Sequence, residues 1–252
     1  MRRGLTLRSL LWPTVALVAL LLAASAPGVW ETALRALFSG ETRVIYQQAS
    51  MLELIGRTAE LVALSSVLSI VVGVTLGVFV THRVGADFHD VVVDITNLGQ
   101  SFPPIAVFTL AVPVLGFGVV PTVLALTLYG VLPVLQNTVA GIQSLPPAVV
   151  ESARGMGLSP WQLLRRVELP LASPVILAGV RVSVVINVAT ATIGAVAGAG
   201  GLGAPIISGL VNADPAVTLQ GAILTAWLAL ILDAYLGAVE RGLVTGTAAS
   251  RA

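Results

Sequence analysis

Residues 151–170, ESARGMGLSPWQLLRRVELP, are a polar, arginine-bearing segment in the middle of an otherwise strongly apolar chain. Of the 252 residues, 56% are hydrophobic and 10% are charged, and the mean hydropathy is +0.97. Soluble domains carry about a quarter charged residues, so this composition predicts a membrane protein. We expect the polar segment to lie outside the bilayer, where a cytoplasmic partner can dock on it.

The charge and the residue types of the chain argue against several kinds of chemistry. The formal net charge of +1 gives no reason to expect nucleic acid binding. Without cysteine the chain has no disulfide and no thiolate chemistry. All 13 basic residues are arginine, and without lysine the chain cannot form a nucleotide-hydrolysing P-loop. Any energy for work across a membrane must therefore come from a partner.

Several apolar windows are long enough to cross a bilayer, which takes about 20 residues in a helix. Helices satisfy their own backbone hydrogen bonds in lipid, so the sequence predicts an all-α membrane bundle with about six spans. The expected spans are Leu10–Ala26, Thr58–Val80, Val91–Val112, Val119–Val139, Ser173–Ala197 and Val217–Val239. The Gly73–Gly77 spacing, GxxxG, predicts close helix packing in the second span.

The predicted organisation has three parts. Residues 1–57 hold the first span and an external loop, residues 58–240 form the transmembrane domain with a cytoplasmic loop at 144–170, and residues 241–252 form a short cytoplasmic tail. The first apolar run ends in small residues, Ala24–Ala26, so it is either an uncleaved span or a cleaved signal segment. The rest of the topology is the same in both cases.

The placement of arginine predicts the orientation, because cytoplasmic loops are enriched in basic residues. With the N-terminus in the cytoplasm, nine arginines lie on that side, three lie outside and one lies within a span. The cytoplasmic set is Arg2, Arg3, Arg8, Arg83, Arg154, Arg165, Arg166, Arg241 and Arg251. The external set is Arg35, Arg43 and Arg57. This bias places the 151–170 segment in the cytoplasm.

The local chemistry of the polar segment predicts two short helices separated by a sharp break. Pro147 can open the first helix, where an amide would be unpaired anyway. Gly155 and Gly157 then end it, because glycine accepts the left-handed conformation of a helix C-cap. Residues 159–162, Ser-Pro-Trp-Gln, form a capping box that opens the second helix. We expect that helix to close at Glu168.

The segment resembles the cytoplasmic signature of permease subunits of bacterial ABC importers. That signature is Glu-Ala-Ala, three residues, Gly, nine residues, then Ile-x-Leu-Pro. This chain keeps the spacing, with small departures at Ser152 and Val167. On the first helix the small residues Ala153 and Gly157 are expected to let another protein approach the backbone. The candidate coupling residues are Glu151, Ser152, Ala153, Arg154, Gly157, Val167, Leu169 and Pro170.

The resemblance extends over residues 58–239. The runs at 126–142 and 180–203 are similar to permeases of the osmoprotectant branch, whose substrates include glycine betaine, choline and carnitine. The GAGGLG at 198–203 is also similar to amino-acid importers of the methionine type, which stay an alternative. The resemblance implies a bacterial inner-membrane transport subunit that is not an enzyme and needs no cofactor. It implies three partners: a second permease copy or paralogue, an ATP-hydrolysing subunit at the cytoplasmic face, and an external binding protein.

Two patterns suggest other chemistry. The GxGxxG at 198–203 matches a dinucleotide-binding fingerprint, but an apolar span precedes it where a strand would be needed, so we interpret it as an external turn. Asp87, Asp90 and Asp94 share a helical face and could hold Mg²⁺ in a membrane enzyme. Acidic residues also favour helix N-termini, which explains the row without a metal. An ion-coupled carrier, with Asp233 as its membrane carboxylate, is a further alternative.

Charged and polar residues at membrane depth are the remaining candidates. Arg181 and Asp233 each cost about 2.5–3.5 kcal/mol at the centre of a span, so we predict that they form an ion pair, either as structural glue or as part of an inner gate. A break is expected at Pro103-Pro104. The candidate translocation-path residues are Gln100, Asn137, Asn187, Thr190 and Thr192. Hydrogen bonds between helices would explain the same residues.

Overall fold

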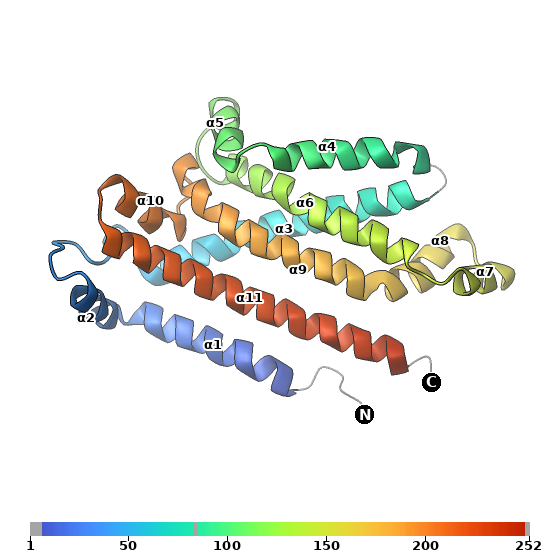
Figure 1. The fold of residues 1–252 in the computed structure, drawn as a ribbon, viewed down its shortest axis with the longest axis horizontal. Helices are drawn as coiled ribbons and strands as arrows, with labels where there is room; N and C mark the ends of the chain where they lie inside the picture. The colour runs from blue at the N-terminus through green and yellow to red at the C-terminus, as the bar shows by residue number, and fades with distance from the viewer. Residues whose placement is uncertain (1–6, 83–84, 250–252) are drawn as a thin grey trace.

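Long helices lie side by side along most of the molecule (Figure 1). The computed structural model describes residues 7–82 and 85–249, and side chains within 10–82 and 85–242. The elements are α1 (Leu7–Ser25), α2 (Pro27–Leu37), α3 (Met51–Thr81), η1 (Ala86–Phe88), α4 (His89–Ser101), α5 (Pro104–Leu115), α6 (Val119–Gln143), α7 (Pro147–Gly155), α8 (Pro160–Leu163), η2 (Leu164–Glu168), α9 (Leu169–Gly194), η3 (Ala195–Ala197), α10 (Gly203–Val211) and α11 (Pro215–Ala249). Every regular element in these ranges is helical, which confirms the all-α prediction.

Four helices are long and apolar enough to cross a membrane, and two bent helix pairs raise the number to six if each pair is one span. The four are Met51–Thr81, Val119–Gln143, Pro160–Ala197 and Pro215–Gly242. They contain the expected second, fourth, fifth and sixth spans. The first expected span corresponds to α1, which packs along α11 (Figure 1).

The third expected span, Val91–Val112, is not one straight helix. It is broken into α4 and α5, whose axes differ by 92°. Phe102 precedes two consecutive prolines and has an extended backbone, with ψ 137°. A residue before proline is pushed out of the helical region, and neither Pro103 nor Pro104 can donate a backbone hydrogen bond. The expected break at these prolines is therefore an elbow that redirects the chain.

Two short helices were not expected from the sequence. α2 follows α1 after a bend of 82° at Pro27. α10 lies between α9 and α11 and packs against both. Each lies at the end of the bundle opposite α7 (Figure 1). They are short helices that cover that end of the bundle.

Small residues set the spacing of the core helices α3, α6 and α9. A Cβ added to Gly73 would lie 2.7 Å from the Cβ of Val134, and one added to Gly77 would lie 2.7 Å from the Cβ of Thr138. A Cβ on Gly130 would clash with Ser69 Oγ. The close approach predicted from the GxxxG spacing is thus confirmed, and it joins α3 to α6.

Arginines lie at both ends of the bundle. We call the end with α7 and α8 the loop end and the other the far end (Figure 1). Among the described residues, the arginines expected to be external lie at the far end, on α2, on the following loop and on the first turns of α3. Arg154, Arg165, Arg166 and Arg241 lie at the loop end. Arg2, Arg3, Arg83 and Arg251 lie outside the described residues.

Candidate functional site: the loop between α6 and α9

α7 begins and ends where its local sequence predicts. Pro146 is the N-cap and Pro147 opens the helix. The chain then leaves the helix at Met156, whose amide donates to the Ser152 carbonyl at 3.0 Å. Gly157 has φ +81°, with open space where a side chain would be. The requirement for glycine there is therefore conformational and not steric.

α8 opens with the predicted capping box. The Gln162 amide donates to Ser159 Oγ at 3.4 Å, and the Ser159 amide donates to Gln162 Oε1 at 2.9 Å. Pro160 occupies the first turn, where its missing N–H has no cost. This reciprocal capping fixes the direction in which the chain leaves the break after Gly157.

The prediction that the second helix closes at Glu168 is wrong. α8 continues through a π-helical turn, η2, into α9, so that Pro160–Ala197 is one helix of 38 residues. Pro170 can make no bond to the carbonyl four residues earlier, and its ring crowds that carbonyl. The wider turn, in which the Leu169 amide donates to the Leu164 carbonyl, relieves this conflict without ending the helix.

The signature residues divide into an exposed and a buried set. The exposed set is Glu151, Ser152, Arg154, Gly157 and Pro170, while Val167 and Leu169 are half-buried. Ala153 is 3% exposed, so the expectation that a partner approaches the backbone over it is wrong. α7 packs against α8 and η2, and the small side chain of Ala153 lets these elements pack closely.

Two exposed apolar side chains of the loop were missed in the sequence. Met156 is 74% exposed and Trp161 is 63% exposed. The Arg165 guanidinium lies 5.2 Å from the centre of the Trp161 ring. Methionine, tryptophan and arginine are enriched in protein interfaces. Their presence within a polar segment was the signal that could have identified them.

One end of the loop is tied to α3. Glu168, the last residue of η2, is 6% exposed. Its Oε2 lies 3.2 Å from Nε2 of His82, the residue that caps α3. This contact joins two elements that are far apart in the sequence.

The comparison with protein families matches residues 71–245 to the inner membrane component of binding-protein-dependent transport systems. The chain belongs to this family. It is therefore a permease subunit of an ABC importer, and the loop between α6 and α9 lies within the matched region.

Curated relatives place this permease in a narrower group. The osmoprotectant import permease protein OsmY of Salmonella typhimurium is 39% identical over 190 residues, which cover 75% of this chain and 80% of the relative. The glycine betaine/carnitine/choline transport system permease protein OpuCB of Bacillus subtilis is 39% identical over 193 residues, covering 75% of this chain and 88% of the relative. The choline transport system permease protein OpuBB of Bacillus subtilis is 38% identical over 195 residues, covering 76% of this chain and 88% of the relative.

Solved structures confirm the permease fold. A chain of the inward-facing MetNI methionine ABC transporter aligns with a TM-score of 0.68 over 77% of this chain and 95% of that chain. The sequence identity is 22%, so this likeness concerns the fold alone.

The polar residues expected along a translocation path lie in separate helix contacts of this permease. Gln100 Nε2 donates to the Tyr129 carbonyl at 2.6 Å. That carbonyl would normally pair with residue 133, which is a proline without an N–H. Tyr129 Oη in turn donates to the Phe102 carbonyl at the α4–α5 elbow, at 2.5 Å. Gln100 and Tyr129 together join the carbonyl that Pro133 leaves unpaired within α6 to the elbow between α4 and α5.

The other members of this set lie on α6 and α9. Asn187 is fully buried and donates to Ser66 Oγ on α3 at 3.2 Å, while Asn137 donates to the Pro133 carbonyl of its own helix. Thr190 is buried, and Thr192 bonds within α9. Contacts between helices account for Gln100 and for Nδ2 of Asn187, while the buried Oδ1 of Asn187 has no hydrogen-bond partner among the described residues. A role for the whole set in translocation stays a prediction.

Arg181 on α9 and Asp233 on α11 form a bidentate ion pair. Nε and Nη2 of Arg181 lie 2.5 and 2.7 Å from the two carboxylate oxygens of Asp233. Glu240, one heptad further along α11, lies 3.3 Å from Nη1. One cation thus holds two carboxylates, and Glu240 was not expected from the sequence. An open recess of about 410 Å³ lies beside the three charges.

The remaining sequence patterns have structural explanations. Gly198, Gly200 and Gly201 all have positive φ, so the GxGxxG forms the turn between η3 and α10. The Thr58 hydroxyl accepts from the Leu202 amide, and Arg57 donates to the Ala199 carbonyl, which ties the turn to α3. Among the described residues, no three acidic, histidine or cysteine side chains are grouped so that they could hold a metal ion, which includes the Asp87–Asp94 row.

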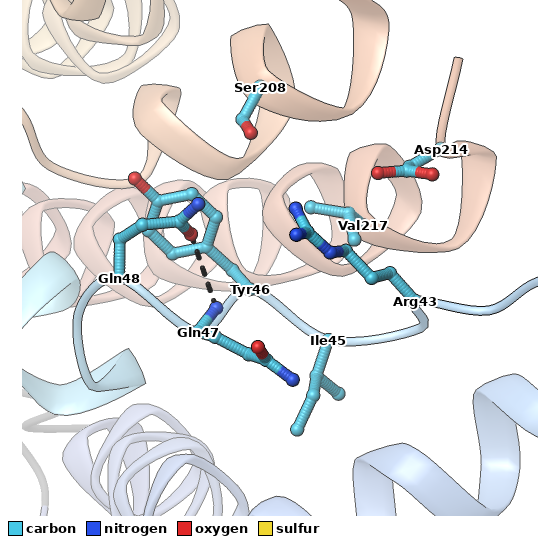
Figure 2. Close-up of a pocket in the computed structure, with 8 residues that line it drawn as sticks. All are labelled: Arg43, Ile45, Tyr46, Gln47, Gln48, Ser208, Asp214 and Val217. Carbon is cyan, nitrogen blue, oxygen red and sulfur yellow. Dashed lines mark hydrogen bonds between the residues drawn. The ribbon is translucent and has the colours of Figure 1, made fainter. Parts of the chain in front are cut away.

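The far end carries a polar recess of about 170 Å³ between the loop before α3 and the α10–α11 turn. Figure 2 shows the two sides of this recess, with Arg43, Val217 and Asp214 on one side and Tyr46, Gln47 and Gln48 on the other. Tyr46 is anchored by its backbone amide, which donates to the buried Gln220 Oε1 at 2.9 Å. The recess therefore has a fixed wall.

Proposed function

We propose that this permease forms the translocation pathway of an importer for osmoprotectants, with quaternary amines such as glycine betaine, choline and carnitine as substrates. The observation that carries the proposal is the similarity over about three quarters of the chain to permeases named for these compounds. The likeness to a methionine transporter is one of fold, at 22% identity, and adds no support for methionine as substrate.

An ATP-binding subunit is the proposed partner of the loop. Exposed Glu151, Arg154, Met156 and Trp161 give the loop charged groups and two large apolar side chains at its surface. That combination suits a protein interface better than contact with water. ATP hydrolysis then takes place in the partner, which docks on this loop and supplies the work.

The orientation follows from the same assignment. The loop end is cytoplasmic, and the far end, with the recess in Figure 2, faces the external binding protein. The start of α1 lies at the loop end, so the N-terminal side of the chain is cytoplasmic (Figure 1). A second permease copy or a paralogue completes the pathway.

Uptake of labelled compounds tests the substrate. Cells from which this permease is deleted should lose uptake of labelled glycine betaine, choline or carnitine that depends on ATP and on the binding protein, and the wild-type gene should restore it. Unchanged uptake of all three compounds together with loss of methionine uptake would overturn the osmoprotectant assignment and favour the alternative.

Variants of the loop test the docking role. Glu151→Lys reverses an exposed charge and Trp161→Glu removes an exposed aromatic ring, and each should abolish uptake while the protein stays in the membrane. Asp87→Lys is the matched control, because Asp87 is an exposed carboxylate at the loop end but outside the loop. Normal uptake by both loop variants would contradict docking at this surface.

A further inference from the structure

Glu168 differs from the other acidic residue of the loop signature. Glu151 is exposed, as expected for a docking residue, whereas Glu168 is 6% exposed. A carboxylate at that depth is costly unless a partner compensates its charge. Its Oε2 has no hydrogen-bond partner among the described residues, and the basic group that faces it is the imidazole of His82.

The nearby group is His82 at the end of α3. Nδ1 of His82 lies 2.8 Å from the Val78 carbonyl, and a carbonyl oxygen can only accept. Nδ1 therefore carries a proton. Nε2, the other ring nitrogen, lies 3.2 Å from Glu168 Oε2. The C-terminal end of α3 also favours a cation. The geometry thus places the free ring nitrogen of His82 against the buried carboxyl group of Glu168.

The position of this pair would allow it to pass movement from η2 to α3. α7 packs against α8 and η2, so a displacement of α7 passes into η2. Two connections leave η2: the backbone into α9, and the Glu168 side chain to the end of α3. α3 is in turn packed along α6 through Gly73 and Gly77. A push on the loop can thus reach two core helices at the same time.

We propose that the His82–Glu168 pair is the link that transmits movement of the loop to α3, and that both are positioning residues for coupling. The proposal rests on the proposed function, because it assumes that a partner moves the loop. The π-helical turn supports it, since such turns in helices are frequent at functional sites. The backbone into α9 alone would leave the end of α3 unconnected to η2 at this point.

The test is the ratio of substrate transported to ATP hydrolysed in proteoliposomes that hold the complete importer. Glu168→Gln keeps the shape of the side chain and removes its charge. We expect ATP hydrolysis to continue and the ratio to fall about five- to tenfold, the lower range of typical coupling between two sites. His82→Lys places a basic group at the end of α3 that can face Glu168, and it should retain most of the ratio.

A double variant separates coupling from stability. His82→Gln alone leaves the buried Glu168 without its basic partner and should lower thermal stability. Adding Glu168→Gln removes the stranded carboxyl group, so thermal stability should return towards the wild-type level while the ratio stays low. A double variant that regains the wild-type ratio would overturn the proposal and make the pair a packing contact. His89→Gln is the control, because His89 pairs with its sequence neighbour Asp90 and links no two helices.

The two proposals fail in different ways. A wild-type complex that transports no osmoprotectant with ATP overturns the proposed function. A wild-type complex that transports normally, together with a Glu168→Gln variant that has the same ratio, overturns the link alone.

Discussion

At the scale of single residues, Arg181 is the charge on which a helix contact depends. It bridges α9 to α11 by holding Asp233 in two hydrogen bonds and Glu240 in a longer one. Removing the Arg181 guanidinium takes a hydrogen-bond partner from both carboxylates and leaves Asp233 with the charge of Arg241, whereas removing Asp233 still leaves Arg181 with Glu240. Loss of Arg181 and loss of Asp233 should therefore lower the stability of the permease by different amounts.

We predict that Arg181→Met lowers stability more than Asp233→Asn. The loss for Arg181→Met should be about 1–3 kcal/mol, below the range of about 3–5 kcal/mol for a fully buried pair, because about a third of each side chain is exposed. Thermal unfolding of the detergent-purified permease measures both variants. An Asp233→Asn variant that is the less stable of the two would show that Glu240 does not share the cation.

Single residues also show how far the sequence could go. The charges of Arg181 and Asp233 were visible because both fall at similar depths in apolar spans. Glu240 lies nearer the end of its helix, where charged residues are common, so its position in the sequence did not suggest a pairing role. The His82–Glu168 contact joins two segments more than eighty positions apart, and no local pattern relates them. Burial and pairing of that kind depend on how helices pack, which one sequence does not reveal.

At the scale of elements, α3 and α6 are held together by glycines that act through the absence of a side chain. We predict that Gly73→Ala destabilises the permease, because the new Cβ would lie 2.7 Å from Val134 Cβ and 3.0 Å from the Val131 carbonyl, within closely packed helices. Gly56→Ala is the matched control on the same helix, with nothing within 4 Å of the added atom.

The control should be neutral or stabilising by up to about 1 kcal/mol, the difference in helix propensity between glycine and alanine. Thermal unfolding in detergent compares the two variants with the wild type. Equal stability of Gly73→Ala and Gly56→Ala would contradict the proposed contact between α3 and α6.

Element boundaries were predictable where caps and prolines define them locally. The capping box at Ser159 and the left-handed Gly157 just after α7 formed as expected. The continuation of α8 into α9 was missed because Pro170 normally ends a helix, and the π-helical turn that accommodates it depends on the helix packing around it. The elbow at residues 102–104 was expected as a break, but its 92° angle was not. Local chemistry predicts where a helix is interrupted more readily than the direction in which the chain continues.

At the scale of the whole molecule, orientation is the property that most needs a direct measurement. The chain contains no cysteine, so single cysteines can be introduced without altering any other. We predict that Met156→Cys reacts with a membrane-impermeant maleimide only in inside-out vesicles, and Ser39→Cys only in right-side-out vesicles. Both residues are exposed, at opposite ends of the bundle.

Added ATP-binding subunit should slow the labelling of Met156→Cys and leave that of Ser39→Cys unchanged. Labelling of Met156→Cys from the external side would show that the orientation is opposite to the proposed one. A cytoplasmic ATP-binding subunit could then not reach the loop. Fast labelling in the presence of the subunit would show that it docks elsewhere.

Because α8, η2 and α9 are continuous, they can move together as one long helix. A helix of 38 residues is about 57 Å long at 1.5 Å per residue. A tilt of about 10° around its midpoint would displace its two ends by about 5 Å in opposite directions, given that length. One end of this helix lies in the loop between α6 and α9, and the other leads into the glycine turn fastened to the first turns of α3. A tilt of this kind would open one end of the pathway while it closes the other end.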